Sequence, residues 1–296
     1  MNGWLNLYKP KGISSARAVG LVKKYLKGSK IGHTGTLDLE AEGVLPLAIG
    51  QATKLVSVLM DSRKTYVFTV QFGVRTDTGD AAGKVIGTSS YIPPEHECVE
   101  VCKKFTGKIQ QTPPAYSALK VGGVRSYKLA REGKEVILAS REITIYSLKC
   151  TNYDRKNGAA TYLAECSKGT YIRTLAEDIA LSLQSLGFVI KLRRIRVGVF
   201  DEKDSINAET LILIAPEEAT RLLQDKCLKI EYVLDDIPAL NADIVLAQKI
   251  AYGQQCFFDV DQNYDLVWVR SDSKIIAIGS LHDKYFKSSR VFNYLD

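Results

Sequence analysis

The chain has 296 residues, of which 46% are hydrophobic and 25% charged. This composition is typical of a globular protein and excludes disordered and fibrous chains, and the length suits one large domain followed by a small one. The longest stretch without a charged side chain, Ile179–Ile190, has 12 residues, whereas a membrane-spanning helix needs about 20. Because no secretory signal is visible either, we expect a cytoplasmic protein that does not contact membranes.

The net charge of +7 is unevenly distributed. Residues 231–296 contain 10 acidic and 6 basic side chains and carry −4, so residues 1–230 contain 34 basic and 23 acidic side chains and carry +11. A strongly basic body is typical of a protein that binds a polyanion, most often nucleic acid, although basic surfaces also serve solubility alone. We expect two domains that meet near residue 230, the first of them basic.

Six cysteines are scattered along the chain without any C-x-x-C pair. This spacing is typical of reduced thiols in a cytosolic protein. The nearest approach to a metal motif combines His96 with Cys98 and Cys102, and it lacks the second pair of ligands that a zinc site requires. We therefore expect no metal ion.

The first predicted element is an amphipathic helix that Ser14 caps and Gly28 ends, with lysines in its last turns, where the helix dipole favours cations. Gly32–Asp38 is too rich in glycine and threonine for a helix interior and is predicted to be a loop. Thr65–Gly73 alternates apolar and polar side chains, which predicts the clearest strand of the chain.

The segment 106–133 combines two turn-forming pairs, Pro113–Pro114 and Gly122–Gly123, with many basic side chains and the aromatic rings of Tyr116 and Tyr127. Long irregular segments in compact domains are often binding loops, and cations mixed with aromatic rings suit looped RNA. We interpret it as an irregular RNA-binding insertion at about 106–133; a solvated surface loop is the alternative.

Two further strands are predicted at 143–149 and 160–167, and then a helix that begins near Tyr171 and continues through Leu186, with Gly187 as its C-terminal cap. A basic, alternating stretch at 191–196 follows. Helical patterns resume after Asp204, a linker falls near 235–238, and short β-like runs occupy 265–270 and 274–278. Strands grouped with helices without regular alternation predict an α+β fold: a mixed, mostly antiparallel sheet with flanking helices and a small β-rich C-terminal domain.

Nucleotide-binding loops of the Walker and dinucleotide types and the hydrolase elbow are absent from the sequence. Asp38, in its glycine-bounded loop, is the strongest catalytic candidate, as a nucleophile or as a carboxylate that stabilises a sugar cation; it could equally cap its own turn. Arg173 falls in the first turn of the predicted helix, where a cation opposes the dipole. A carboxylate partner would compensate for that position, and the spacing leaves open which one.

Seven segments between Leu5 and Arg194 resemble, in the same order, the motifs of the TruB family of tRNA pseudouridine synthases: Leu7–Gly12, Gly32–Asp38 with Gly43–Pro46, Lys64–Tyr66, Arg75–Thr78, Pro113–Lys120, Ser167–Arg173 and Leu192–Arg194. The resemblance implies a pseudouridine synthase fold for 1–230, a small PUA-like RNA-binding domain for 231–296, and no cofactor. It also implies isomerisation of the T-loop uridine at tRNA position 55, with tRNA as the partner. Separately, we expect no protein partner and a monomer.

The resemblance further implies roles for individual residues. Asp38 would be the essential carboxylate, Arg173 its ion-pair partner, and Tyr66 the ring that stacks on the flipped base and removes its proton. The remaining residues would contact the substrate: His33, Tyr171, Leu192 and Lys9. Where the family typically has proline after the aspartate, this chain has Leu39, which predicts a looser loop. Two alternatives stay open, namely a non-catalytic RNA-binding or tRNA-folding protein and a sibling synthase that acts on another RNA.

Overall fold

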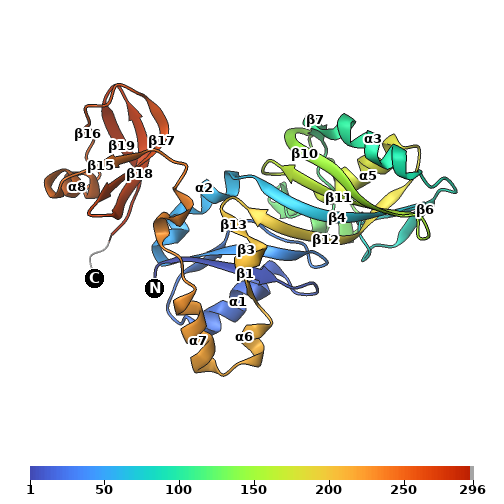
Figure 1. Ribbon diagram of the computed structural model, residues 1–296, viewed down its shortest axis with the longest axis horizontal. Coiled ribbons are helices and arrows are strands. Elements are labelled where there is room, and N and C mark those ends of the chain that lie inside the picture. The colour runs from blue at the N-terminus through green and yellow to red at the C-terminus, as the bar shows by residue number, and fades with distance from the viewer. Residues whose placement is uncertain (294–296) are drawn as a thin grey trace.

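The computed structural model describes residues 1–293 (Figure 1), so the last three residues of the predicted C-terminal domain lie outside the described part. A large mixed sheet forms the body of the protein, in the order β14-β1-β3-β12-β4-β11-β10-β7, with β2 added to β3 and β13 to β12. The pairs β1–β14 and β12–β3 are parallel and the other pairs antiparallel. These strands are β1 (Gly3–Lys9), β2 (Ile31–His33), β3 (Glu42–Ile49), β4 (Lys64–Phe72), β7 (Gly107–Gln111), β10 (Arg141–Asp154), β11 (Ala159–Cys166), β12 (Gly187–Val197), β13 (Phe200–Asp201) and β14 (Ile206–Asn207).

Helices pack on this sheet in two groups (Figure 1). Each group has its own hydrophobic core. The core at β4, β10 and β11 is covered by α3 (Glu95–Phe105) and α5 (Ile172–Ser182). The core at β1 and β3 is covered by α1 (Ser15–Tyr25), α6 (Thr210–Leu213) and α7 (Pro216–Asp225). Tyr66 and Leu192 pack against both cores. They therefore mark the junction of the two halves of the sheet.

The predicted start of α1 is confirmed. Ser14 adopts an extended conformation and its hydroxyl accepts a hydrogen bond from the backbone N–H of Arg17 at 3.1 Å, as an N-cap does. The predicted mixed, mostly antiparallel sheet with flanking helices is confirmed as well.

The predicted end of α5 is wrong. The helix stops at Ser182, with Gln184 in the left-handed region at φ 56°, and Gly187 is the first residue of β12 rather than a helix cap. A Cβ at Gly187 would lie 2.7 Å from the Cβ of Ala180 and 2.9 Å from the Cγ1 of Val70. Glycine is thus needed there because helix and sheet approach closely, not because the helix ends.

The segment 106–133 is more regular than predicted. Its first part is β7, which pairs with β10 at the edge of the large sheet. The rest contains a short hairpin, β8 (Lys120–Val121) and β9 (Val124–Arg125), and the helix α4 (Ser126–Arg131). The prediction of an irregular insertion was therefore wrong for these parts, because short polar elements carry almost no hydrophobic periodicity.

The C-terminal part forms a second sheet, as predicted, in the order β15-β17-β18-β19-β16 with the helix α8 (Ile244–Ala251) against it. Its strands are β15 (Ala239–Asn241), β16 (Cys256–Phe257), β17 (Tyr264–Ser271), β18 (Lys274–His282) and β19 (Tyr285–Val291). Trp268 and Phe292 share a hydrophobic core with Trp4 and Phe200, so the two sheets are packed together. Among residues 1–293, no helix is both long and apolar enough to cross a membrane.

Candidate active site

Asp38 lies in the loop between β2 and β3, which the start of α1 holds in place. The hydroxyl of Ser15, itself buried, accepts a hydrogen bond from the N–H of Leu37 at 2.9 Å and donates one to its carbonyl oxygen at 3.1 Å. The N–H of Gly12 donates to the carbonyl of Leu39 at 2.8 Å. The backbone is thus fixed on both sides of Asp38, although Leu39 stands where a proline was expected, and the Asp38 side chain is 44% exposed.

Lys9 supports the same region from inside the protein. Its side chain is fully buried, and the ammonium donates to the carbonyl oxygens of Pro10 at 2.9 Å and Ile13 at 2.8 Å. Burial lowers the pKa of Lys9 to about 8, against the opposing attraction of the Asp38 carboxylate. The turn that precedes Ser15 thus engages two of the three donors of the ammonium, and the contact of Lys9 with the substrate stays a prediction.

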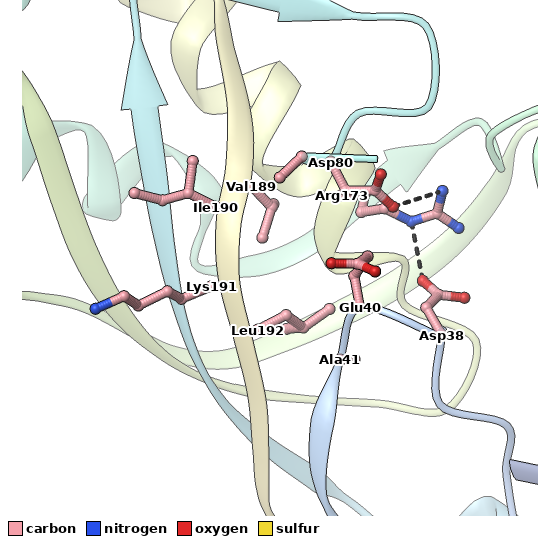
Figure 2. A pocket seen from close by; sticks show the side chains of 10 residues that line it. Asp38, Glu40, Ala41, Asp80, Arg173, Val189, Ile190, Lys191 and Leu192 are labelled. Carbon is pink, nitrogen blue, oxygen red and sulfur yellow. Dashed lines mark ion pairs between the residues drawn. The ribbon is translucent and has the colours of Figure 1, made fainter. Parts of the chain in front are cut away.

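Arg173 lies in the first turn of α5, and the carboxylate that its position requires is Asp38. Its Nε forms an ion pair with the Oδ2 of Asp38 (Figure 2), at 2.9 Å, and its side chain is 6% exposed. Nη1 donates to the carbonyl of Thr78 at 2.8 Å, and Nη2 to the carbonyl of Tyr116 at 2.9 Å. One guanidinium therefore joins the Asp38 loop, the turn after β5 (Val74–Thr76) and the basic insertion.

The sequence did not single out Asp80, which completes this group. Its Oδ2 lies 3.7 Å from Nη1 of Arg173 (Figure 2), and its Oδ1 accepts hydrogen bonds from the hydroxyl of Thr78 at 2.6 Å and the N–H of Ala82 at 3.1 Å. The available signal was a second aspartate in the turn-rich segment 75–83, which is equally typical of a turn that caps itself.

A small pocket of about 10 Å³, which opens to solvent, lies beside this ion pair. One wall carries Asp38, Asp80 and Arg173, while Val189 and Leu192 of β12 contribute to an apolar wall (Figure 2). An apolar wall opposite a few fixed polar groups suits a small planar ligand with polar edges. The full lining is Asp38, Glu40, Ala41, Asp80, Ala81, Arg173, Val189, Ile190, Lys191 and Leu192.

Tyr66, His33 and Tyr171 are not part of the lining of this pocket. Tyr66 stands on β4 beside Arg194 of β12, and burial raises its pKa, with the guanidinium of Arg194 acting in the opposite direction. His33 accepts a hydrogen bond at Nδ1 from the N–H of Gly35 at 3.4 Å. Burial, reinforced by the charge of Arg194, lowers the pKa of His33 and favours a neutral ring.

Tyr171 forms the N-cap of α5 and is tied to the sheet by its backbone. Its N–H donates to the side-chain oxygen of Gln111 at 2.8 Å, and the amide of Gln111 donates back to the Tyr171 carbonyl at 3.1 Å. The guanidinium of Arg141 lies over its ring, 5.0 Å from the centroid. Gln111 thus fixes where α5 begins, one residue before Arg173 enters the first turn.

The fold is that of the pseudouridine synthases. The structure of an H/ACA ribonucleoprotein bound to a substrate RNA containing 2′-deoxyuridine matches it with a TM-score of 0.73, at 22% sequence identity, over 99% of this chain and 86% of that one. In sequence, the N-terminal domain of the TruB family of pseudouridylate synthases matches residues 23–172. The C-terminal domain of tRNA pseudouridylate synthase B matches residues 173–235.

Two relatives named tRNA pseudouridine synthase B cover almost the full length. That of Rickettsia bellii (strain OSU 85-389) is 61% identical over 291 residues, 98% of both chains. That of Rickettsia akari (strain Hartford) is 58% identical over 296 residues, 99% of both chains. The chain belongs to the TruB family of pseudouridine synthases, and it is therefore an isomerase.

Proposed function

We propose that this isomerase converts the T-loop uridine at position 55 of tRNA into pseudouridine, with Asp38 as its essential carboxylate. The observation that carries the proposal is the 2.9 Å ion pair between Asp38 and the buried Arg173, at a pocket with one charged and one apolar wall. The name of the relatives, tRNA pseudouridine synthase B, supports tRNA as the substrate.

The reaction needs little more than a fixed carboxylate. The C1′–N1 bond of uridine breaks, the base rotates, and C1′ forms a bond to C5; C5 loses a proton and N1 gains one, so no atoms are added or lost. Asp38 acts on the target nucleotide, and Arg173 aims its carboxylate through Nε. The two remaining arms of Arg173 are held by backbone carbonyls, which fixes the aim before substrate arrives.

The target base must leave its stack in the folded RNA before it reaches this pocket, at a cost of a few kcal/mol. Leu192 supports the base from the apolar wall. Tyr66 stacks on the base and Tyr171 lines its pocket; both belong to segments that resemble family motifs. Tyr66 is the group that accepts the proton from C5. His33, held neutral, fills the space that the flipped base leaves in the RNA.

Charge supports an RNA partner. Residues 1–230 carry a net charge of +11, and the insertion that includes α4 is joined to the active site because Tyr116 accepts a hydrogen bond from Arg173. Phosphate contacts dominate the affinity of most RNA-binding proteins. We propose that the insertion grips the T stem-loop of tRNA in the cytoplasm and that the enzyme works as a monomer; the free cysteines of the described residues suit a reducing compartment.

A direct assay tests this function. The protein is incubated with a T-stem-loop RNA, and pseudouridine is detected by mass spectrometry after base-specific derivatisation. Product from the native chain and none from Asp38→Asn is the expected result. Binding without product from either chain would favour the RNA-binding alternative, and product only from a different RNA would favour the sibling synthase.

A further inference from the structure

Arg194 is a buried cation that forms no ion pair with a carboxylate among residues 1–293. Its side chain lies in β12, the residue is 2% exposed, and its hydrogen bonds go to backbone oxygens: Nε to Val44 at 2.8 Å and Nη2 to Gly35 at 3.1 Å. Arg173, the other buried arginine of the described residues, has two carboxylates. Burial of a charge without an acidic partner is costly. A functional role for Arg194 would account for this unfavourable position.

The sheet register places Arg194 directly opposite Tyr66. Strands β12 and β4 are antiparallel neighbours (Figure 1). In their register Arg194 pairs with Tyr66. Directly opposed side chains stand on the same face, close enough to interact. On its other side, Arg194 is paired in register with Gly43, at the start of the strand that follows the Asp38 loop.

The charges around Tyr66 come from three elements. Arg194 in β12 favours the ionised phenol, whereas Cys166 in β11 and Asp38 in its loop disfavour it. Burial lowers the pKa values of Lys9 in β1 and Lys64 in β4, both to about 8, and that of His33 in β2; the positive charge of Arg194 acts in the same direction on all three. Arg194 is thus the cation that acts on Tyr66 most strongly within a cluster of several.

We propose that Arg194 is a positioning residue for the proposed reaction: its guanidinium orients the hydroxyl of Tyr66 and stabilises the phenolate that accepts the proton from C5. This role rests on the proposed function. As C1′ moves from N1 to C5, the C5 proton passes to the phenolate oxygen, and N1 takes up a proton from solvent. The phenol then returns its proton to solvent, so neither protons nor charge accumulate over a turnover.

The experiment measures the ionisation of Tyr66 directly. All 15 tyrosines are replaced by 3-fluorotyrosine, and the ¹⁹F resonance of Tyr66 is assigned by its loss in Tyr66→Phe. Titration of the free protein should show a higher pKa for Tyr66 in Arg194→Gln than in the native chain, and a lower one in Asp38→Asn. Arg193→Gln is the matched control, because Arg193 is 44% exposed and faces Glu202; it should leave the resonance unchanged.

The same variants are then assayed for conversion of T-stem-loop RNA as a function of pH. Each unit by which the pKa rises lowers the phenolate fraction about tenfold at a fixed pH below it, so kcat of Arg194→Gln should fall by that factor, with its pH midpoint moved upward. Arg194→Lys, which keeps the charge but not the fork, should give a smaller shift in the same direction and also serves if the glutamine variant does not fold.

An unchanged Tyr66 pKa in both Arg194 variants would overturn the proposal, as would a shifted pKa with an unshifted pH midpoint of kcat. The titration uses protein without RNA, so it tests Arg194 even if T-stem-loop RNA is not a substrate. Conversion by the native chain without a shift in the Tyr66 resonance would overturn the role of Arg194 and leave the proposed function standing.

Discussion

The hydroxyl of Ser15 forms two hydrogen bonds with the backbone of Leu37, 22 residues further along the chain: it donates to the carbonyl and accepts from the amide. Leu37 is the residue immediately before Asp38. A side chain at the start of α1 therefore fixes the local backbone of the candidate catalytic carboxylate, and the turn that leads into this helix is itself held by the ammonium of Lys9.

Ser15→Ala should lower kcat by about 10²-fold, because a misplacement of about 1 Å at the reacting group has that effect. It should also destabilise the fold by about 1–3 kcal/mol, since it leaves the buried polar groups of Leu37 unpaired. The adjacent Ser14→Ala is the control: it removes the N-cap of α1, at about 1 kcal/mol, without touching Leu37. Equal losses of kcat in the two variants would argue that the hydrogen bonds between Ser15 and Leu37 do not position Asp38.

Arg173→Lys keeps the positive charge but loses the planar guanidinium, whose three nitrogens contact Asp38, Thr78 and Tyr116 together. We expect kcat for a T-stem-loop RNA to fall by at least about 10²-fold, measured under single-turnover conditions. Arg75→Lys is the matched control, because Arg75 forms a looser ion pair with Glu177 at 3.8 Å and is 43% exposed. Near-native turnover by Arg173→Lys would show that charge alone suffices.

Asp38→Ala should keep RNA affinity within about threefold of the native chain, because contacts to phosphates dominate binding and Asp38 carries none of the positive charge. Fluorescence anisotropy with a labelled T-stem-loop at fixed salt measures this. The exposed Asp61, which pairs with Lys168, gives a control variant, Asp61→Ala, that removes one negative charge elsewhere. A large loss of affinity specific to Asp38→Ala would contradict the prediction.

Lys128→Ala, in the last turn of α4, should weaken RNA binding and reduce the slope of log K against log salt concentration by about 0.7–0.9, the share of one phosphate contact. Binding isotherms at several salt concentrations give the slope. Lys226→Ala, at the C-cap of α7, lies outside both the insertion and the C-terminal domain and should leave the slope unchanged. The reverse pattern would place the RNA on α7 instead of the insertion.

Lys9 should make stability depend on alkaline pH. Its pKa is about 8 in the folded protein and 10.5 in the unfolded chain, so the unfolded state binds more protons between these values and stability rises with pH. The unfolding free energy of the native chain minus that of Lys9→Met should therefore increase by up to about 3 kcal/mol between pH 8 and 10.5. Urea denaturation of both proteins across this pH range measures the difference. A difference that does not change with pH would refute the prediction.

The sequence predicted both the class of fold and the ion pair between Asp38 and Arg173, but from different kinds of evidence. Hydrophobic periodicity predicts α1 and β4, since both are amphipathic. The pairing of Asp38 with Arg173 came from a resemblance of motifs, because residues 135 positions apart have no local signal. The short β8–β9 hairpin and the true end of α5 escaped prediction, because Leu183 and Leu186 keep the helical spacing after the helix has stopped.

Burial of cations was the least predictable part of the site. Lys9 and Arg194 both belong to recognised motifs. A sequence cannot show that the Lys9 ammonium donates to the carbonyls of Pro10 and Ile13, or that the Arg194 guanidinium has no carboxylate partner among residues 1–293. Asp80 escaped for a related reason, since aspartates in turns are common and only the folded chain brings this one to Arg173.

The indole of Trp4 donates a hydrogen bond to the carbonyl of Ile230, 226 residues later, and the N–H of Trp4 bonds to Leu228. The first strand of the chain thus finds its final neighbours only when most of the polypeptide has been made. During synthesis the edge of β1 and the apolar face of Trp4 would wait exposed, a state prone to wrong pairing. From this topology we expect the edge of β1 to complete its pairing late in folding, because contacts between distant parts of a chain form slowly.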